Sequence, residues 1–404
     1  MPDSLPVGTL SVGARARDLK PVTDQGLSVP GPPADLQWPP EGDGGTPGGR
    51  GVPRWTKWLG VALVVFVIAA IAGAVIRIPY DTFSPGGALN LETRVSVKGA
   101  KTYPGRGELS LLFVRERTNI NLWTWLAGTL DSNTDIVKQD AVTGGTSQRY
   151  ADLQAVCDMT QSQVHARVAA LKTLGYRVPT LPGLTVADLP QYDGKVPLPA
   201  YNVLEPCDEI VAADGHVIGR NTDLSKIVEA HRPGTSVTLR INRGGKLETL
   251  KVPVVAVPGG RRIIGVDLEP RYNVPVPIDI NTSDISGPSA GLAMTLAIID
   301  QLTPGNLTGG KNVAVTGTID PNGNVGEIGA LEQKAVAARA AGAKLFIVPA
   351  CANDPGKAAC LEDIAKATKR VGKDVKVAPV STLAQALDVL RAAGGQGVPT
   401  PAST

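Results

Sequence analysis

A serine set between small residues is the first group in this sequence that could do chemistry. Ser289 stands in the string Gly287-Pro288-Ser289-Ala290-Gly291. Small residues on both sides let the backbone turn sharply and leave the serine hydroxyl accessible. The apolar run that follows predicts a helix, whose first backbone amides can stabilise a developing oxyanion. We therefore predict that Ser289 is a nucleophile, with Gly287 and Pro288 shaping its turn.

A histidine is the usual base for such a serine, and G-x-S-x-G also marks the nucleophile of α/β-hydrolases. Those enzymes need a catalytic histidine later in the chain than the serine. Here the three histidines, His165, His216 and His231, all precede Ser289. They fall in predicted helical or hairpin regions, and we interpret them as surface residues or locally satisfied groups. A histidine-based triad in another chain order is the weaker alternative.

A lysine can replace histidine as the base if burial lowers its pKa. At the reference pKa of about 10.4, a lysine is nearly all protonated at neutral pH and accepts no proton. Lys334 lies in GALEQKAVAARAAGAK, at the start of a predicted helix rich in alanine and valine. Lys311 and Lys344 lie at the edges of predicted elements, where a lysine is solvated. Lys334 is therefore the candidate base, against the ordinary alternative of a solvated lysine.

Three stretches together resemble the proteolytic domain of Lon-type Ser-Lys proteases: GPSAG, AVTGTID and GALEQKAVAARAAGAK. The resemblance implies that Ser289 is the nucleophile, that Lys334 is the general base, and that Thr316 helps to hold the lysine. Ala330 stands where that family usually has a second glycine, and we expect this small-for-small change to leave the dyad intact. Classical members have K-D-G-P-S-A-G where this chain has DISGPSAG, so a role for Asp284 does not carry over.

The resemblance extends to membrane-anchored, PDZ-containing Lon-like proteases of Gram-positive bacteria over about residues 78–395. It rests on SPGGALNL, on MTQSQVHARVAALKTLGY and on the block LTPGNLTGGKNVAVTGTIDPNGNVGEIGALEQK. Residues 200–257 resemble the second half of a PDZ domain, with a hairpin at an Ala-Asp-Gly turn, a short helix and two closing strands. Binding of a peptide ligand by strand addition is implied by this resemblance; a small non-binding β module is the alternative. The family also implies a homo-oligomeric ring.

An uncharged apolar run, WLGVALVVFVIAAIAGAVI, occupies residues 58–76. It is long enough to cross a hydrocarbon layer of about 30 Å as a helix. Arg50, Arg54 and Lys57 precede it, whereas Arg77 follows it alone, which favours a cytoplasmic N-terminus. A buried core helix and a cleaved signal peptide are the alternatives, the second disfavoured by the long polar segment before the run. We expect a single-pass protein of the cell membrane with residues 78–404 outside the cytoplasm.

The composition points away from nucleic acids and metals. The formal charge is +3, from 40 basic and 37 acidic residues, and a nucleic-acid binder would show a strongly basic face. The cysteine and histidine spacings fit no zinc site, so we expect neither a metal nor another cofactor. The string GNLTGGK at 305–311 fits a phosphate loop, but Asn312 follows it in place of Ser or Thr. We expect a plain loop there and activity without ATP.

The four cysteines allow three disulfide pairings. Cys351 and Cys360 flank a short loop, and we favour this pair, with four free thiols as the alternative. The proline-rich stretch 178–199 is expected to be a connection.

The predicted fold class is α+β multidomain, with one N-terminal transmembrane helix, a PDZ-like β module and a C-terminal α/β proteolytic domain of the Lon type. The expected segments are a disordered cytoplasmic tail (1–54), the transmembrane helix (55–77), an N-terminal part of strands and a helix (78–195), the PDZ-like module (196–258), the proteolytic domain (262–393) and a disordered tail (394–404). The expected function is ATP-independent hydrolysis of peptide bonds in unfolded or flexible extracytoplasmic proteins and peptides. A catalytically inert membrane scaffold is the alternative.

Overall fold

The structure is a computed structural model, and it describes residues 53–219, 221–282, 285–351, 356–397 and 399. Most of the two predicted disordered tails lies outside these residues, as do Arg50 and Asp284. Of the described residues, those up to Leu63 belong to one compact unit and those from Val64 onward to a second.

Helix α1 (Arg54–Val75) contains the apolar run predicted to cross a membrane, apart from its last residue, Ile76. It has 22 residues, and an 18-residue window within it has a mean hydropathy of 2.7, so by length and composition it can span a bilayer. Its large side chains, Phe66 and Ile71 among them, are exposed. A helix of this length and apolarity, with exposed apolar side chains, is suited to lipid contact.

A six-stranded sheet forms the centre of the larger part of the molecule. Its order is β20-β19-β16-β3-β1-β4, and its strands are β1 (Tyr80–Asn90), β3 (Glu108–Arg117), β4 (Asp135–Lys138), β16 (Asn312–Val315), β19 (Leu345–Pro349) and β20 (Lys376–Val380). The strands β20, β19, β16 and β3 are parallel, whereas β1 is antiparallel to both of its neighbours. The sheet therefore combines strands from both sides of the PDZ-like segment in the sequence.

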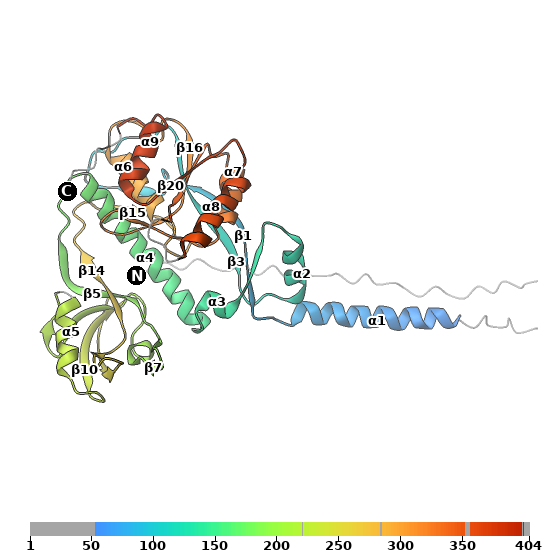
Figure 1. The fold of residues 1–404 in the computed structure, drawn as a ribbon, viewed down its shortest axis with the longest axis horizontal. Coiled ribbons are helices and arrows are strands. Elements are labelled where there is room, and N and C mark those ends of the chain that lie inside the picture. The colour runs from blue at the N-terminus through green and yellow to red at the C-terminus, as the bar shows by residue number, and fades with distance from the viewer. Residues whose placement is uncertain (1–52, 220, 283–284, 352–355, 398, 400–404) are drawn as a thin grey trace, which may run out of the picture. The chain divides into compact units, whose positions relative to one another are not determined.

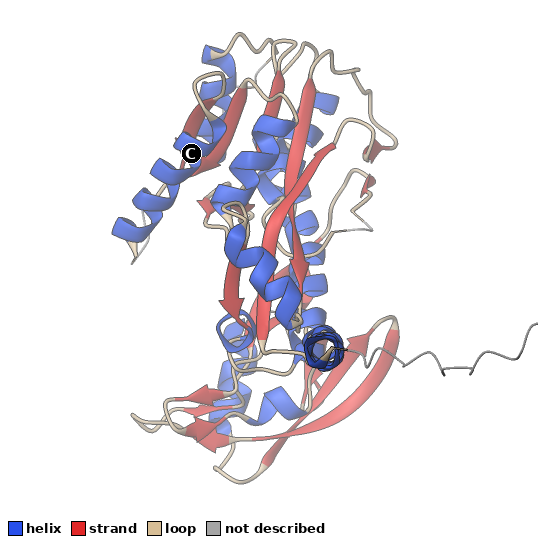
Figure 2. Cartoon of the chain, turned by 90° about the vertical axis from the view of Figure 1, so that its right-hand side faces the viewer, coloured by secondary structure: helices blue, strands red, loops and turns tan. Residues whose placement is uncertain are grey.

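Helices cover both faces of this sheet, as Figure 2 shows. On one face, α6 (Gly291–Leu302), α9 (Leu383–Ala392) and α4 (Gln148–Thr173) share a core with Val313 and Val315. On the other face, α7 (Leu331–Ala340) and α8 (Lys357–Val371) pack with Ala314 and Phe346. Successive strand residues point to opposite faces. Parallel strands buried on both faces read as continuous apolar runs, which is what NVAV and LFIVP show.

A second sheet, of order β11-β10-β8-β5-β14, forms the PDZ-like module. It contains β5 (Thr180–Asp188), β8 (Glu209–Ala213), β10 (Ser236–Arg243), β11 (Lys246–Pro253) and β14 (Asp267–Tyr272), with β9 (His216–Val217) pairing with β8 and with helix α5 (Asn221–Ala230) beside it. The predicted hairpin, helix and two closing strands are confirmed.

The predicted connection at 178–199 is wrong, because β5 runs through it. Pro182 and Gly183 stand at an irregularity of this strand, between Leu181, which pairs with Arg271, and Leu184, which pairs with Pro270. Gly183 has φ +91°, a value that favours glycine. A bulge accommodates the proline and the glycine that made the sequence look like a loop.

The remaining elements are short. They are β2 (Val95–Val97) paired with β15 (Ile278–Ile280), β6 (Tyr192–Asp193) with β7 (Val196–Pro197), β12 (Val255–Ala256) with β13 (Arg262–Ile263), β17 (Thr318–Ile319) with β18 (Val325–Gly326), the helices α2 (Leu122–Leu130) and α3 (Gln139–Thr143), and a 3₁₀ turn at Pro199–Asn202.

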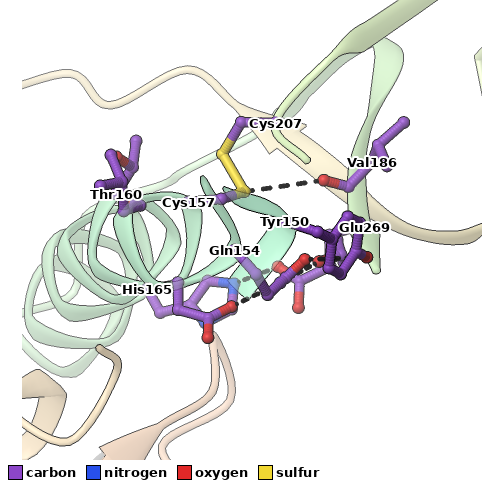
Figure 3. Close-up of a disulfide and its surroundings, with 11 residues drawn as sticks. Tyr150, Gln154, Cys157, Thr160, His165, Val186, Cys207 and Glu269 are labelled. Carbon is purple, nitrogen blue, oxygen red and sulfur yellow. Dashed lines mark hydrogen bonds and ion pairs between the residues drawn. A yellow bond between two sulfur atoms is a disulfide. The ribbon is translucent and has the colours of Figure 1, made fainter. Parts of the chain in front are cut away.

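Helix α4 contacts α6 and the PDZ-like strand β5, and it passes between α6 and the PDZ-like strands (Figure 1). A disulfide joins its Cys157 to Cys207 of the PDZ-like segment, with a Cα–Cα distance of 5.4 Å (Figure 3). Close by, the Gln154 amide donates a 2.7 Å hydrogen bond to the carbonyl oxygen of Ala187. The favoured Cys351–Cys360 disulfide is confirmed as well. Covalent and polar contacts thus fasten the PDZ-like module to α4.

The two disulfides should differ in their contribution to stability, because they close loops of different length. Cys157 and Cys207 are 50 positions apart in the sequence, whereas Cys351 and Cys360 are 9 positions apart. By loop-closure entropy, replacing Cys157 and Cys207 by alanine should lower the free energy of unfolding by about 4 kcal/mol, and replacing Cys351 and Cys360 by about 2.5 kcal/mol. Urea unfolding of the two double variants measures this difference. Equal losses, or a greater loss for the second pair, would contradict the expectation.

Candidate active site

Ser289 lies in a tight turn directly before α6 begins at Gly291. Gly287 has φ +86°, in the region that favours glycine, so the turn needs a residue without a side chain there. The amides of Ser289 and Ala290 precede the first helical turn, where backbone N–H groups have no acceptor within the helix. These amides and the positive end of the helix dipole are suited to hold an oxyanion formed at Ser289.

Helix α4 supports this turn from behind. The amide of Gly287 donates a 2.9 Å hydrogen bond to the carbonyl oxygen of Ala155. The hydroxyl of Ser162 donates another, also of 2.9 Å, to the carbonyl oxygen of Pro288. Sequence reasoning missed Ser162, because a serine in an amphipathic helix carries no mark of its tertiary partner.

Lys334 meets Ser289 from α7. Its Nζ lies 2.8 Å from Oγ of Ser289, within hydrogen-bond distance. The side chain is only 3% exposed, and burial lowers the pKa of Lys334 from 10.5 to about 8. At pH 7 about a tenth of such amines are neutral, against fewer than about one in a thousand at the ordinary pKa. A neutral amine at this distance can accept the hydroxyl proton of Ser289.

Thr316 fixes the backbone of the serine. It directly follows β16 and is fully buried. Its hydroxyl donates a 3.3 Å hydrogen bond to the carbonyl oxygen of Ser289, and the amide of Gly317 donates a second, of 2.9 Å, to the same oxygen. The contact seen is thus with the nucleophile's own peptide group, and direct support of Lys334 by Thr316 stays a prediction.

The sheet brings the two side chains together. The helices α6 and α7 cover opposite faces, and their N-terminal residues meet beyond the carboxyl end of β16, where Thr316 lies. In sheets with parallel strands this edge is where ligands commonly bind. The predicted residues Gly287, Pro288, Ser289, Thr316 and Lys334 therefore gather at one place.

The start of α7 contains a strained residue. Ala330 caps the helix with φ +55°, in the left-handed region, and its carbonyl oxygen accepts a 3.1 Å hydrogen bond from the amide of Lys334. This backbone conformation costs a residue with a side chain about 1 kcal/mol or more. The substitution for glycine, which looked harmless in the sequence, thus strains the turn that places Lys334.

A cleft of about 530 Å³ opens beside Pro288. Ser162 and the strand residues Thr318 and Ile319 line it, together with the carboxylates of Glu269 and Asp320. It lies next to the serine turn and offers room for an extended chain.

Two histidines are engaged by partners of their own. His165 also lines the cleft; its Nε2 lies 2.5 Å from Glu269, and its Nδ1 3.2 Å from the carbonyl oxygen of Ile319. His231 is held in the same way by Asp214, at 2.6 Å. Both fit the interpretation as locally satisfied groups.

Two family models match this chain. Residues 272–392 match the Lon protease (S16) C-terminal proteolytic domain, and residues 175–254 match the PDZ domain. The PDZ match begins upstream of residue 196 and includes β5, in agreement with the position of that strand in the second sheet. The chain thus combines a PDZ-like module with a C-terminal domain of the Lon type.

Curated relatives are Lon proteases. The Lon protease of Neorickettsia sennetsu is 39% identical over 101 residues, and that of Trichlorobacter lovleyi 42% identical over 101 residues; each match covers 25% of this chain and 11% of the relative. Lon protease 2 of Syntrophobacter fumaroxidans is 28% identical over 165 residues, 38% of this chain and 20% of the relative. The chain therefore spans only a small part of the length of these relatives. Among solved structures, the PDZ domain of an SdrC-like protein from Listeria monocytogenes is 23% identical, with 22% of this chain and 90% of that chain covered and a TM-score of 0.20.

The reactivity of Ser289 should rise with pH and level off above about pH 8, because only the neutral form of Lys334 accepts the proton. Below pH 8 the rate should fall about tenfold for each pH unit. Labelling of Ser289 by a fluorophosphonate, followed by mass spectrometry across the pH range, measures this profile. A labelling rate that does not change between about pH 6 and pH 9 would show that no group with such a pKa activates the serine.

Restoring a glycine at position 330 should relieve the strain at the start of α7. We expect Ala330→Gly to raise the free energy of unfolding by up to about 1 kcal/mol, since glycine adopts the left-handed conformation without steric cost but loses more entropy on folding. Urea unfolding measures the difference, and Ala335→Gly, inside the same helix, is the control that should destabilise. Destabilisation by both changes would refute the account of residue 330.

Proposed function

We propose that this chain, which combines a PDZ-like module with a C-terminal domain of the Lon type, is a membrane-anchored serine endopeptidase. Its substrates are unfolded or flexible proteins and peptides outside the cytoplasm. The observation that carries the proposal is the contact of 2.8 Å between Oγ of Ser289 and the buried amine of Lys334. The similarity to Lon proteases over residues 272–392 supports the reaction type.

The reaction follows from the positions of these groups. Neutral Lys334 takes the hydroxyl proton while Oγ of Ser289 attacks the peptide carbonyl carbon. The amides at the start of α6 hold the negative charge that forms on the carbonyl oxygen. The protonated lysine then gives its proton to the leaving nitrogen, the C–N bond breaks, and an acyl ester of Ser289 remains. Water attacks this ester, with Lys334 again as the base, and releases the carboxylic acid and the free serine.

Two surfaces support an extended peptide as the substrate. The cleft beside Pro288 adjoins the serine turn. In the PDZ-like module, a groove of about 450 Å³ lies between α5, with Leu224 and Val228, and the stretch from Ile263 to Leu268. The strand β14 is at the edge of its sheet, so a bound peptide can add to it as a further strand.

Action without ATP is part of the proposal. The glycine-rich stretch 305–311 lies between α6 and β16, so a helix precedes the loop and a strand follows it. A phosphate-binding loop has the reverse order. Cleavage without ATP-driven unfolding suits substrates that are already unfolded or flexible.

The placement of the protease outside the cytoplasm rests on two features. Arg54 and Lys57 stand at the start of α1 and Arg77 alone follows it, which favours a cytoplasmic N-terminus. The residues after α1 contain the disulfides Cys157–Cys207 and Cys351–Cys360, and disulfides persist mainly in oxidising compartments.

Cleavage should depend on both members of the dyad. Wild-type protein should cut a reduced and alkylated protein substrate in the absence of ATP, and Ser289→Ala and Lys334→Met should each lower the rate by about 10⁴-fold or more. Products are identified by mass spectrometry. Lys344→Met, at an exposed lysine, is the matched control that should leave the rate unchanged.

Wild-type activity in Lys334→Met would disprove the mechanism. If the wild-type protein cleaves neither unfolded proteins nor peptides at any pH tested, the alternative function of a catalytically inert membrane scaffold would be favoured instead.

A further inference from the structure

A short helix after α1 exposes an apolar face with no charged residue. Helix α2 has the sequence LWTWLAGTL. Leu122, Trp123, Leu126 and Leu130 are between 42% and 82% exposed. With 3.6 residues per turn, the spacings of three, four, seven and eight place them on one side of the helix. Exposed large apolar side chains on one helix face indicate a contact surface.

The opposite side of α2 is packed against the protein. Gly128 is buried there, and a side chain at this position would lie 3.1 Å from Ile136 of β4. Asn121 caps the helix by accepting a 2.8 Å hydrogen bond from the amide of Thr124. The helix is therefore held firmly with its apolar face turned outward.

The position of α2 along α1 indicates what covers this face. The indole N–H of Trp123 donates a 2.9 Å hydrogen bond to the carbonyl oxygen of Ala70, and the side-chain amide of Asn121 donates one of 3.1 Å to that of Ala74. Gly73 is the buried residue of α1, and a side chain there would lie 2.8 Å from the same indole.

These contacts fix the depth of α2. With a rise of 1.5 Å per residue, Ala70 lies about 8 Å before the end of α1 at Val75. A helix docked on the last two turns of a membrane-spanning segment lies at the boundary between acyl chains and headgroups. Interfacial helices bury their apolar faces by about 5–10 Å at this level, and tryptophan is enriched there.

We infer that α2 is an interfacial helix whose face of Leu122, Trp123, Leu126 and Leu130 is covered by the lipid of the bilayer surface. The inference rests on the proposed anchoring by α1. Because β4 packs on the other side of α2, the bilayer contact holds the catalytic part at a fixed height and orientation above the membrane, in place of free motion on a tether.

The test uses the full chain in nanodiscs with bromine atoms on the acyl chains near the headgroups. The substitutions Trp38→Phe, Trp55→Phe and Trp58→Phe leave Trp123 and Trp125 as the reporters. We expect these to lose most of their emission to the brominated lipid, with a shift to shorter wavelength. In the same background with Trp123→Phe and Trp125→Phe, Ile68→Trp reports on α1 and should be quenched, whereas Val217→Trp, an exposed site of the PDZ-like module, should not.

A second variant tests the face itself. Leu126→Asp combined with Leu130→Asp should reduce the quenching of Trp123 and Trp125 while cleavage of a soluble peptide continues, which also shows that the protein is folded. Quenching of Ile68→Trp without quenching of Trp123 and Trp125 would overturn the inference, leave the anchoring intact, and indicate a protein partner or a second copy on this face. Absence of quenching at all sites would refute the anchoring by α1 and the inference together.

Discussion

The burial of one amine at Lys334 is the constraint on which the rest of the catalytic part depends. Because burial lowers the pKa of this lysine to about 8, the unfolded chain binds the proton more tightly than the folded chain does. At neutral pH this difference costs about 3 kcal/mol of stability, and the cost falls as the pH rises from about 8 to 10.5. Chemistry at neutral pH therefore requires a fold with enough packing to offset the cost. The helices on both faces of the six-stranded sheet provide that packing.

Position matters as much as pKa, and α4 connects the elements that set it. Its Ala155 and Ser162 hold the turn that carries Ser289, through Gly287 and Pro288. The same helix is tied to the PDZ-like module by Cys157–Cys207 and by the bond between Gln154 and Ala187. The PDZ-like module and the turn that carries Ser289 are therefore both held by one helix.

Much of this could be predicted from the sequence where the signal is local. Local patterns predict the turn at Ser289 and the helix that begins before Lys334. They also predict the apolar strands at 312–315 and 345–349 and the helices that follow them. What depends on distant partners could not be predicted. Pro182 and Gly183 made the sequence of β5 look like a loop. The strand accommodates them in a bulge, which forms because β14 pairs with β5 on both sides of it. The role of Ser162 depends on Pro288, which is far away in the sequence, and the left-handed backbone of Ala330 has no signature in an alanine.

The pairing of β3 with β16 bears on the order in which the chain can fold. Asn312 pairs with Glu108, so the middle of the sheet closes only after the whole PDZ-like segment has been synthesised. Contacts between such distant residues form late, since a long loop must first be ordered. If the segment after α1 crosses the membrane as it is synthesised, β1 and β3 emerge first. The edge of β3 that later pairs with β16 is then unpaired, and an unpaired edge is prone to wrong pairing. The PDZ-like module, whose strands lie close together in sequence, can fold before β16 has been synthesised. The carbonyl oxygen of Ser289 has no contact with Thr316 and Gly317 until the segment that contains β16 has been made. Under the proposed function, the topology thus delays proteolysis until the chain beyond the PDZ-like module has been synthesised.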